Sequence, residues 1–451
     1  MRLLRRLTQR ILGGGFVRGA ATIVAGTGLA QLLVVLSSPV LTHLYTPSDY
    51  GIFSIATSVL ILASITCLQY DFAIPLPKDD VTAANLLGLS LVVNVGMSLL
   101  TAIALVVLGP WLFGLFGAAA LGPYVLLLAL VQFGSGIVSA LLKWAIRTQN
   151  YAEIALNRVV SSVTLVGLQV GLGALGVGVL GLVIGVAAGS VAGASRLARA
   201  AWRTHAAAFR QISRKGMAAA AWRYKRFPIF SSGSTLLAYL GVRAPLLALV
   251  AFFGTEVGGE YALAERVLYL PLTLVAGSVG QVFTAESARL ANDNPQELRR
   301  SFRRTTVSLA LTALLPAIGI ALGAPFLAGL VFGPAWTTAG WIVSILIPMF
   351  YFAFVFTSTG DVLFVLERQG LHLLREILRI VILAGSIPVA AALQLPPLMA
   401  IVVLSAAGCI TYTLYGLISW YAVINSRPTP HGADASVGQV YPRPERDGLI
   451  D

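Results

Sequence analysis

Long apolar runs alternate with short polar connections along almost the whole chain. Twelve of these runs reach about 20 residues, the length at which an α-helix crosses the hydrocarbon core of a bilayer. The fifth and sixth runs are separated only by Leu175 and Gly176. The runs cover residues 20–44, 51–77, 83–109, 122–142, 156–174, 177–195, 228–253, 261–288, 305–332, 339–366, 377–395 and 398–424. This pattern predicts an all-α polytopic membrane protein with about 12 transmembrane helices.

Composition supports a membrane protein and excludes a soluble domain. Hydrophobic residues make up 57% of the 451 residues and charged residues only 11%, whereas roughly a quarter of a soluble protein is charged. So little polar surface cannot cover the apolar residues in water. Lys and Arg outnumber Asp and Glu by 31 to 18, which gives a net charge of +13. The position of these charges decides between nucleic acid binding and membrane topology.

The positive charges fall on one side of the predicted membrane. With twelve spans, every second connection is cytoplasmic, and these connections and both termini hold every Lys and Arg except Arg243 and Arg266. The positive-inside rule predicts this distribution when both termini are cytoplasmic. The net charge therefore reflects topology, and we expect no nucleic acid partner.

A basic segment separates two sets of six predicted spans. Residues 44–56 and 252–264 align through Gly51 and Gly259, and each segment joins the first helix of its set to the second. Duplication of a six-helix unit explains the similarity, and an even number of helices gives both copies one orientation. Chance similarity of two short segments is the alternative. We expect a basic cytoplasmic N-terminus (1–19), two six-helix bundles (20–195 and 228–424), a basic cytoplasmic linker (196–227) and a disordered cytoplasmic tail (425–451).

Arg243 and Arg266 are the main candidates for substrate binding. Arg243 lies about 15 Å from the outer end of its span and Arg266 about 9 Å, at 1.5 Å per helical residue. Ionisable side chains inside a membrane usually face a partner or a water-filled cavity, and arginine binds phosphate oxygens bidentately. The two arginines therefore predict an anionic, phosphorylated substrate. The structural alternative is that Arg266 reaches the outer headgroups and pairs with an acid such as Glu260.

Three acids near the inner ends of their spans, Asp71, Glu286 and Asp361, are candidates for a gate or an ion-coupling group. The structural alternative is pairing with arginines of the connections, such as Arg289 or Arg368. Glu265 precedes Arg266 but points about 100° away on a helix, so these neighbours do not face each other.

Signals for catalysis, metals and cofactors are absent from the sequence. No Gly-x4-Gly-Lys-Ser/Thr loop and no cluster of His, Asp and Glu suited to a metal occurs. We therefore expect no catalytic residue, no metal and no cofactor. The sixth span carries glycine at every fourth position, a pattern that favours close helix packing; these glycines are Gly181, Gly185, Gly189 and Gly193.

Three stretches resemble the polysaccharide transporter (O-antigen flippase-like) family, within the superfamily it shares with multidrug and toxin extrusion exporters. They are Leu41-Thr-His-Leu-Tyr-Thr-Pro-Ser-Asp-Tyr-Gly-Ile-Phe53, Leu68-Gln-Tyr-Asp-Phe-Ala-Ile-Pro-Leu-Pro-Lys78, and Tyr261-Ala-Leu-Ala-Glu-Arg-Val-Leu-Tyr-Leu-Pro-Leu-Thr273 with Gly280-Gln-Val-Phe283. The similarity covers about residues 20–424. One departure is Gln69, where many relatives have arginine before the Tyr-Asp or Tyr-Glu pair.

The resemblance implies a bacterial inner-membrane flippase with two six-helix bundles around a central V-shaped cavity. Such proteins move undecaprenyl-pyrophosphate-linked oligosaccharide to the outer leaflet by alternating access, for O-antigen, capsule or exopolysaccharide synthesis. A polysaccharide polymerase and a chain-length regulator are the partners it suggests. A peptidoglycan-precursor flippase and a multidrug exporter of the same superfamily are the alternatives, although an acidic cavity would suit cationic drugs better than two arginines. A membrane glycan enzyme or a structural scaffold are the remaining hypotheses.

Overall fold

The computed structural model describes residues 15–60 and 65–426, and helices account for most of this part of the chain. The predicted basic N-terminus and C-terminal tail lie largely outside the described residues. The first half contains α2 (Gly15–Leu36), α3 (Ser38–Leu44), α4 (Pro47–Val59), η2 (Tyr70–Ala73), α5 (Asp80–Leu115), η3 (Ala119–Tyr124), α6 (Val125–Arg147), α7 (Tyr151–Ala174), α8 (Val179–Phe209) and α9 (Arg214–Arg223). The second half contains η4 (Phe227–Ser231), α10 (Ser232–Phe253), α11 (Thr255–Pro271), η5 (Leu272–Ala276), α12 (Gly277–Asp293), α13 (Pro295–Phe332), η6 (Pro334–Trp336), α14 (Thr337–Thr357), α15 (Val362–Val365), α16 (Gln369–Ala392) and α17 (Pro397–Ile424).

Nine helical segments within the described residues are long and apolar enough to cross a membrane. The predicted all-α polytopic fold is confirmed, but three of the twelve predicted spans do not meet these criteria. The prediction of a continuous helix over 51–77 is wrong: α4 ends at Val59, and Leu68 and Gln69 have φ of 46° and 61° before the short η2 turn. The other two exceptions, α11 with α12 and α16, are helical but carry several charged residues.

Local sequence signals explain where several helices begin and end. Thr46 caps α4 in a capping box, in which its hydroxyl accepts from the Asp49 backbone N–H and the Asp49 carboxylate accepts from the Thr46 N–H; this reciprocal arrangement satisfies two free helix donors. The boundary between the fifth and sixth spans is real, since Gly176 and Gly178 have φ of 70° and 66° between α7 and α8. Only glycine adopts such angles without strain.

The glycines of α8 allow α7 to pack against its backbone. A Cβ built on Gly189 would lie 2.8 Å from the Ser161 carbonyl oxygen, and one on Gly193 would lie 2.5 Å from the Ser161 hydroxyl. These contacts confirm that the glycine pattern serves close packing.

The segment predicted as a cytoplasmic linker (196–227) contains two helical parts: α8 continues to Phe209, and α9 follows within a few residues. Most of the segment expected to be a linker is therefore helical.

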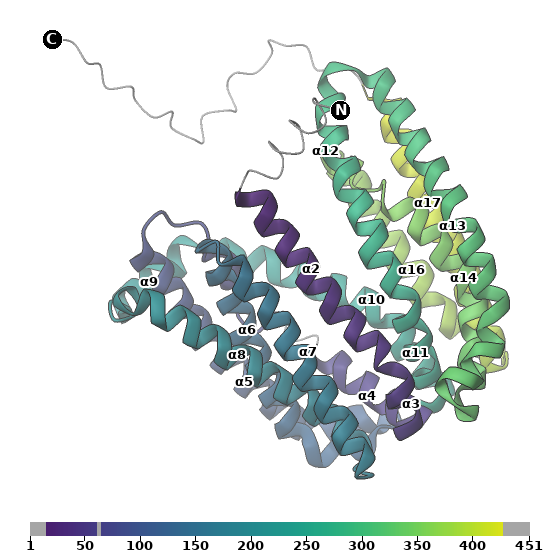
Figure 1. The fold of residues 1–451 in the computed structure, drawn as a ribbon, viewed down its shortest axis with the longest axis horizontal. Coiled ribbons are helices and arrows are strands. Elements are labelled where there is room, and N and C mark those ends of the chain that lie inside the picture. Colours follow the sequence, from purple (N-terminus) through teal and green to yellow (C-terminus); the bar gives the residue numbers. More distant parts are fainter. Residues whose placement is uncertain (1–14, 61–64, 427–451) are drawn as a thin grey trace.

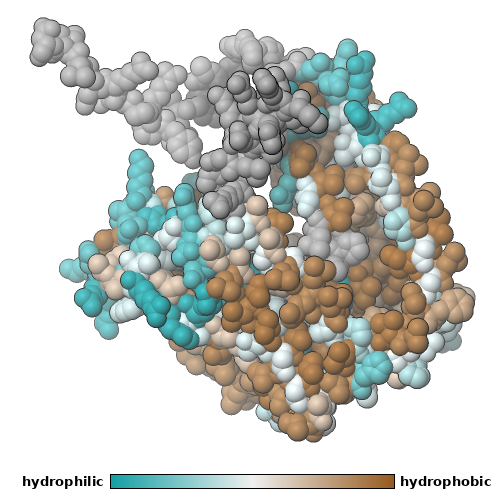
Figure 2. Space-filling view, in the orientation of Figure 1, coloured by the Kyte–Doolittle hydropathy of each residue, from teal (hydrophilic) through white to brown (hydrophobic). Residues whose placement is uncertain are grey.

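The two halves meet where α4 crosses α11. Figure 1 shows α2 to α9 on one side and α10 to α17 on the other, diverging from this crossing toward the end that carries α9 and the turn between α12 and α13. A buried apolar cluster joins the halves at the crossing and includes Ile55 and Ala56 of α4 with Tyr261 and Ala264 of α11. Figure 2 shows hydrophobic residues over most of the visible face and hydrophilic ones at the diverging ends, the distribution expected of helices surrounded by lipid.

Candidate functional site

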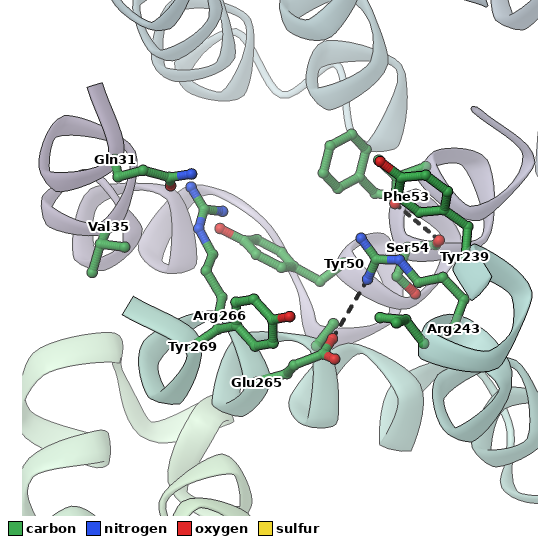
Figure 3. Close-up of a pocket in the computed structure, with 13 residues that line it drawn as sticks. Gln31, Val35, Tyr50, Phe53, Ser54, Tyr239, Arg243, Glu265, Arg266 and Tyr269 are labelled. Carbon is green, nitrogen blue, oxygen red and sulfur yellow. Dashed lines mark hydrogen bonds and ion pairs between the residues drawn. The ribbon is translucent and has the colours of Figure 1, made fainter. Parts of the chain in front are cut away.

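A cavity of about 500 Å³ lies beside the crossing, between the two halves. It is lined by α2, α4, α10 and α11, so both halves contribute to it (Figure 3). Arg243 and Arg266, predicted from the sequence as a pair, both line this one cavity. The remaining lining residues are mostly aromatic, aliphatic or uncharged polar: Gln31, Val35, Tyr50, Phe53, Ser54, Thr57, Tyr239, Val242, Ala262 and Tyr269, together with Glu265.

Arg243 forms an ion pair with Glu265 across the turn between α10 and α11. The Arg243 Nη1 atom lies 3.5 Å from the Glu265 Oε2 atom, and the two side chains are 34% and 17% exposed. The sequence analysis considered Glu265 only as a neighbour of Arg266 and missed this contact. The sequence does contain a signal for this ion pair. Arg243 and Glu265 are equally far from Gly254, and two antiparallel helices joined by a tight turn bring such positions together. Glu265 is therefore a third charged residue of the site.

Arg266 donates a hydrogen bond of 2.6 Å from Nη2 to the backbone carbonyl of Val34, near the C-terminus of α2. Its guanidinium also lies beside the Tyr50 hydroxyl (Figure 3). Among the described residues it has no ion-pair partner within 4.0 Å. The alternative in which Arg266 pairs with Glu260 is wrong, since Glu260 is buried and lies close to the Thr338 hydroxyl instead.

The charges of the cavity favour an anion. Two guanidiniums and one carboxylate line it, which leaves one positive charge unbalanced by the lining residues. Electrostatic attraction is stronger beside apolar walls than in water, and guanidinium groups bind phosphate through paired N–H donors. The cavity can therefore hold the phosphate end of a ligand between α2, α10 and α11.

The three predicted acids lie elsewhere, and the structure does not bring them together with the arginines. Asp71, in η2, is buried and its Oδ2 accepts a 2.7 Å hydrogen bond from the Ser139 hydroxyl. Glu286, on α12, is exposed. Asp361, the N-cap residue of α15, lines a second cavity in the C-terminal half. The predicted pairing of these acids with Arg289 or Arg368 is absent from the ion pairs of the described residues.

The second cavity also has a volume of about 500 Å³ and contains two arginines that the sequence analysis assigned to a connection. These residues, Arg375 and Arg379, belong to α16, which begins at Gln369. Their side chains are 6% and 17% exposed. The statement that only Arg243 and Arg266 lie within the helical bundle is therefore wrong.

The chain matches a family model described as a polysaccharide biosynthesis protein over residues 40–340, more than half of its length. It belongs to this family. A curated relative, the amylovoran biosynthesis protein AmsL of Erwinia amylovora, is 24% identical over 122 residues, which span 27% of this chain and 31% of AmsL. The match thus covers about a third of the length of that relative.

Solved structures of two kinds share the fold of this polysaccharide biosynthesis protein. An inward-facing multidrug resistance MATE family transporter superposes with a TM-score of 0.70 at 16% identity, over 87% of this chain and 94% of that one. The lipid II flippase MurJ, in an inward closed conformation, gives a TM-score of 0.65 at 12% identity, over 90% of each chain. A mutant of the MATE transporter VcmN of Vibrio cholerae gives 0.60 at 16% identity, over 91% of this chain and 95% of that one. The resemblance stated from the sequence is confirmed, and the protein is a multi-pass membrane protein of a polysaccharide biosynthesis family.

Proposed function

We propose that this protein is a flippase that carries undecaprenyl-pyrophosphate-linked oligosaccharide from the cytoplasmic to the outer leaflet of the bacterial inner membrane. The observation that carries the proposal is that Arg243 and Arg266 line one cavity between the two halves. Their guanidiniums bind the pyrophosphate, and the lipid tail stays in the bilayer. Membership of a polysaccharide biosynthesis family supports a substrate destined for a surface polysaccharide, such as O-antigen, capsule or exopolysaccharide.

In this proposal the structure represents the inward-facing state. Both termini are cytoplasmic by the positive-inside rule, so the crossing of α4 and α11 lies at the outer side and the diverging ends of the helices face the cytoplasm (Figure 1). Substrate enters between the halves, and the transition to the outward-facing state separates α4 from α11. This is the alternating access expected of parallel repeats that move about a central cavity.

The membrane potential can drive the cycle. One elementary charge moved across 100 mV is worth about 2.3 kcal/mol, and a pyrophosphate more than neutralises the one unbalanced positive charge of the cavity. An inside-negative potential therefore drives the loaded site outward and draws the empty cationic site back inward. Ion antiport through a carboxylate such as Asp71 is the alternative energy source. Collapse of the potential in vesicles that keep their ion gradients separates the two.

The cavity argues against the export of cationic drugs. Such substrates need unpaired acidic groups, whereas the carboxylate of Glu265 lies within 3.5 Å of Arg243. A peptidoglycan precursor also carries a pyrophosphate and would satisfy the same arginines, so the glycan distinguishes the two flippase activities.

A deletion strain provides the test. We expect lipid-linked oligosaccharide to accumulate on the cytoplasmic leaflet and to disappear on complementation with the wild-type gene. Arg243→Ala, expressed at a normal level, should fail to complement, and Arg243→Lys should complement in part because it keeps the charge without the bidentate geometry. Normal surface polysaccharide in the deletion strain, or full complementation by Arg243→Ala, would contradict the proposal.

A further inference from the structure

The second cavity is connected to the arginine cavity by shared lining residues. It lies within the C-terminal half, among α12, α14, α16 and α17. Tyr269 lines both cavities. A smaller hollow of about 60 Å³ lies between them and shares Glu265 with the first and Arg379 and Tyr412 with the second. The two cavities therefore adjoin each other at Tyr269, the residue that a ligand occupying both would pass.

The second cavity carries no net charge, unlike the first. Arg375 and Arg379 are balanced by Glu376 and Asp361, which also line it. The Glu376 carboxylate accepts from Arg379 Nη2 at 2.8 Å and from the Tyr415 hydroxyl at 2.8 Å. Because these charges already compensate each other, the cavity offers little net attraction to a phosphate.

Its polar groups suit a ligand that both donates and accepts hydrogen bonds. Gln281 and Asp361 are exposed and line the cavity, Gln281 from α12 and Asp361 from the N-terminus of α15. The Nε of Arg379 is buried without a hydrogen-bond partner among the described residues. A sugar hydroxyl is donor and acceptor at once, and amide, carboxylate and guanidinium groups complement it in both roles.

Aromatic side chains provide the apolar part of such a site. Tyr269, Tyr412 and Tyr415 line the cavity, and a tyrosine combines a large apolar face with a polar hydroxyl. Gly277 and Gly280 also line the cavity, and neither places a side chain in it. The π-helical turn η5 immediately precedes Gly277; such turns occur frequently at functional sites.

We infer that this second cavity is the binding subsite for the sugars closest to the pyrophosphate, an inference that rests on the proposed function. Gly277 follows Arg266 by eleven residues along the helical segment α11–η5–α12, which places this part of the second cavity about 17 Å further from the crossing at 1.5 Å per residue. The pyrophosphate lies beside α4 and α11, and the glycan extends from it toward the diverging ends of the helices. The arginine cavity thus recognises the anion that all such lipids share, and the second cavity discriminates between glycans.

Binding of two lipids to the full-length protein in nanodiscs tests the inference. One probe is undecaprenyl pyrophosphate without sugar, and the other is the lipid-linked oligosaccharide extracted from a strain that lacks this gene. We expect the wild type to bind the glycan-bearing lipid at least tenfold more tightly. Gln281→Ala and Asp361→Asn should remove most of this difference, and Gln281→Ala, which alters no charge, should leave the affinity for the bare lipid unchanged. Arg289→Ala, at an exposed position of α12 outside both cavities, is the matched control and should keep the difference.

The possible outcomes of this binding experiment distinguish the sugar subsite from the proposed flippase function. Equal affinity of the wild type for both lipids overturns the sugar subsite but leaves the flippase proposal standing if Arg243→Ala weakens both. Loss of affinity for the bare lipid in Gln281→Ala also overturns it, because the cavity would then bind the anion. Failure of the wild type to bind either lipid overturns the proposed function itself.

Discussion

Arg243 and Glu265 stand eleven residues on either side of Gly254, and their side chains meet at 3.5 Å on the wall of the arginine cavity. The carboxylate therefore competes with any anion for the Arg243 guanidinium. The pair is a single contact at 3.5 Å, worth about 1 kcal/mol, whereas a pyrophosphate can bind both guanidiniums through paired N–H donors and can therefore overcome the competition. Glu265 keeps the empty arginine in place without binding it permanently.

Glu265→Gln should increase the affinity for undecaprenyl pyrophosphate. The amide keeps the size of the side chain but removes the competing charge, and about 1 kcal/mol corresponds to roughly fivefold tighter binding. Titration of the lipid into protein in nanodiscs measures the change. Glu256→Gln, at an exposed position of the same helix outside the cavity, should bind as the wild type does. Weaker binding by Glu265→Gln would show that the carboxylate contacts the ligand favourably instead.

Arg266→Gln should weaken both the protein and its binding site. The substitution removes the charged donor to the Val34 carbonyl, and hydrogen bonds of charged groups contribute about 1.5–3 kcal/mol. We expect a lower midpoint of thermal unfolding in detergent and at least tenfold weaker binding of undecaprenyl pyrophosphate. Arg266→Lys should recover part of both losses, since it retains the charge. Unchanged affinity in Arg266→Gln, with the protein folded, would exclude Arg266 from the site.

Much of the fold could be predicted from the sequence, because a helix that crosses a bilayer needs about 20 consecutive, mostly apolar residues. Eleven of the twelve predicted runs correspond to helical chain. The exception is the run over 51–77: α4 ends at Val59, and Leu68 and Gln69 adopt left-handed backbone angles that hydropathy does not detect. Similarly, Arg375 and Arg379 belong to α16, although their charges suggested a connection in water. Three contacts offset the cost of burial: Arg379 pairs with Glu376, and Arg375 donates to the Gly360 carbonyl and stacks over the Tyr415 ring. Such partners are visible only after folding.

Part of the candidate site could also be predicted from the pattern of apolar and charged residues. An arginine within an apolar run is conspicuous, so Arg243 and Arg266 could be found from the sequence alone. Glu265 was missed because its partner lies on the preceding helix, at a position defined by the turn at Gly254. The second cavity depends on residues from four helices, and no local pattern in the sequence connects them.

The proposed orientation predicts opposite accessibility for two exposed positions. Leu175, in the connection between α7 and α8, is 77% exposed and should face the outside, whereas Lys215 on α9 should face the cytoplasm. Single cysteines are introduced at each position after Cys67 and Cys409 are replaced by serine. A membrane-impermeant maleimide should label Leu175→Cys in intact spheroplasts and Lys215→Cys only after permeabilisation. The reverse pattern would invert the topology and the direction of transport.

At the crossing of α4 and α11, we expect a single added methyl group to disrupt the contact between the two helices. A Cβ built on Gly51 would lie 1.8 Å from the Thr255 carbonyl oxygen, and one on Gly259 would lie 1.8 Å from the Pro47 carbonyl oxygen. These two glycines are the aligned positions of the internal repeat predicted from the sequence, and they bring the two backbones into contact where the halves meet. Gly51→Ala must therefore separate α4 from α11, and backbone shifts of this kind cost about 1–3 kcal/mol.

We expect Gly51→Ala to shift the protein away from the state with a closed crossing. Ser48 reports this change, because its hydroxyl lies 3.1 Å from that of Thr255 across the crossing. A cysteine at Ser48 should react severalfold faster with an impermeant maleimide in Gly51→Ala than in the parent. Gly96→Ala on α5 is the matched control: a Cβ there meets nothing within 4 Å, and alanine favours a helix over glycine by about 1 kcal/mol. If Gly51→Ala and Gly96→Ala behave alike in reactivity and stability, the crossing does not hold the two halves together.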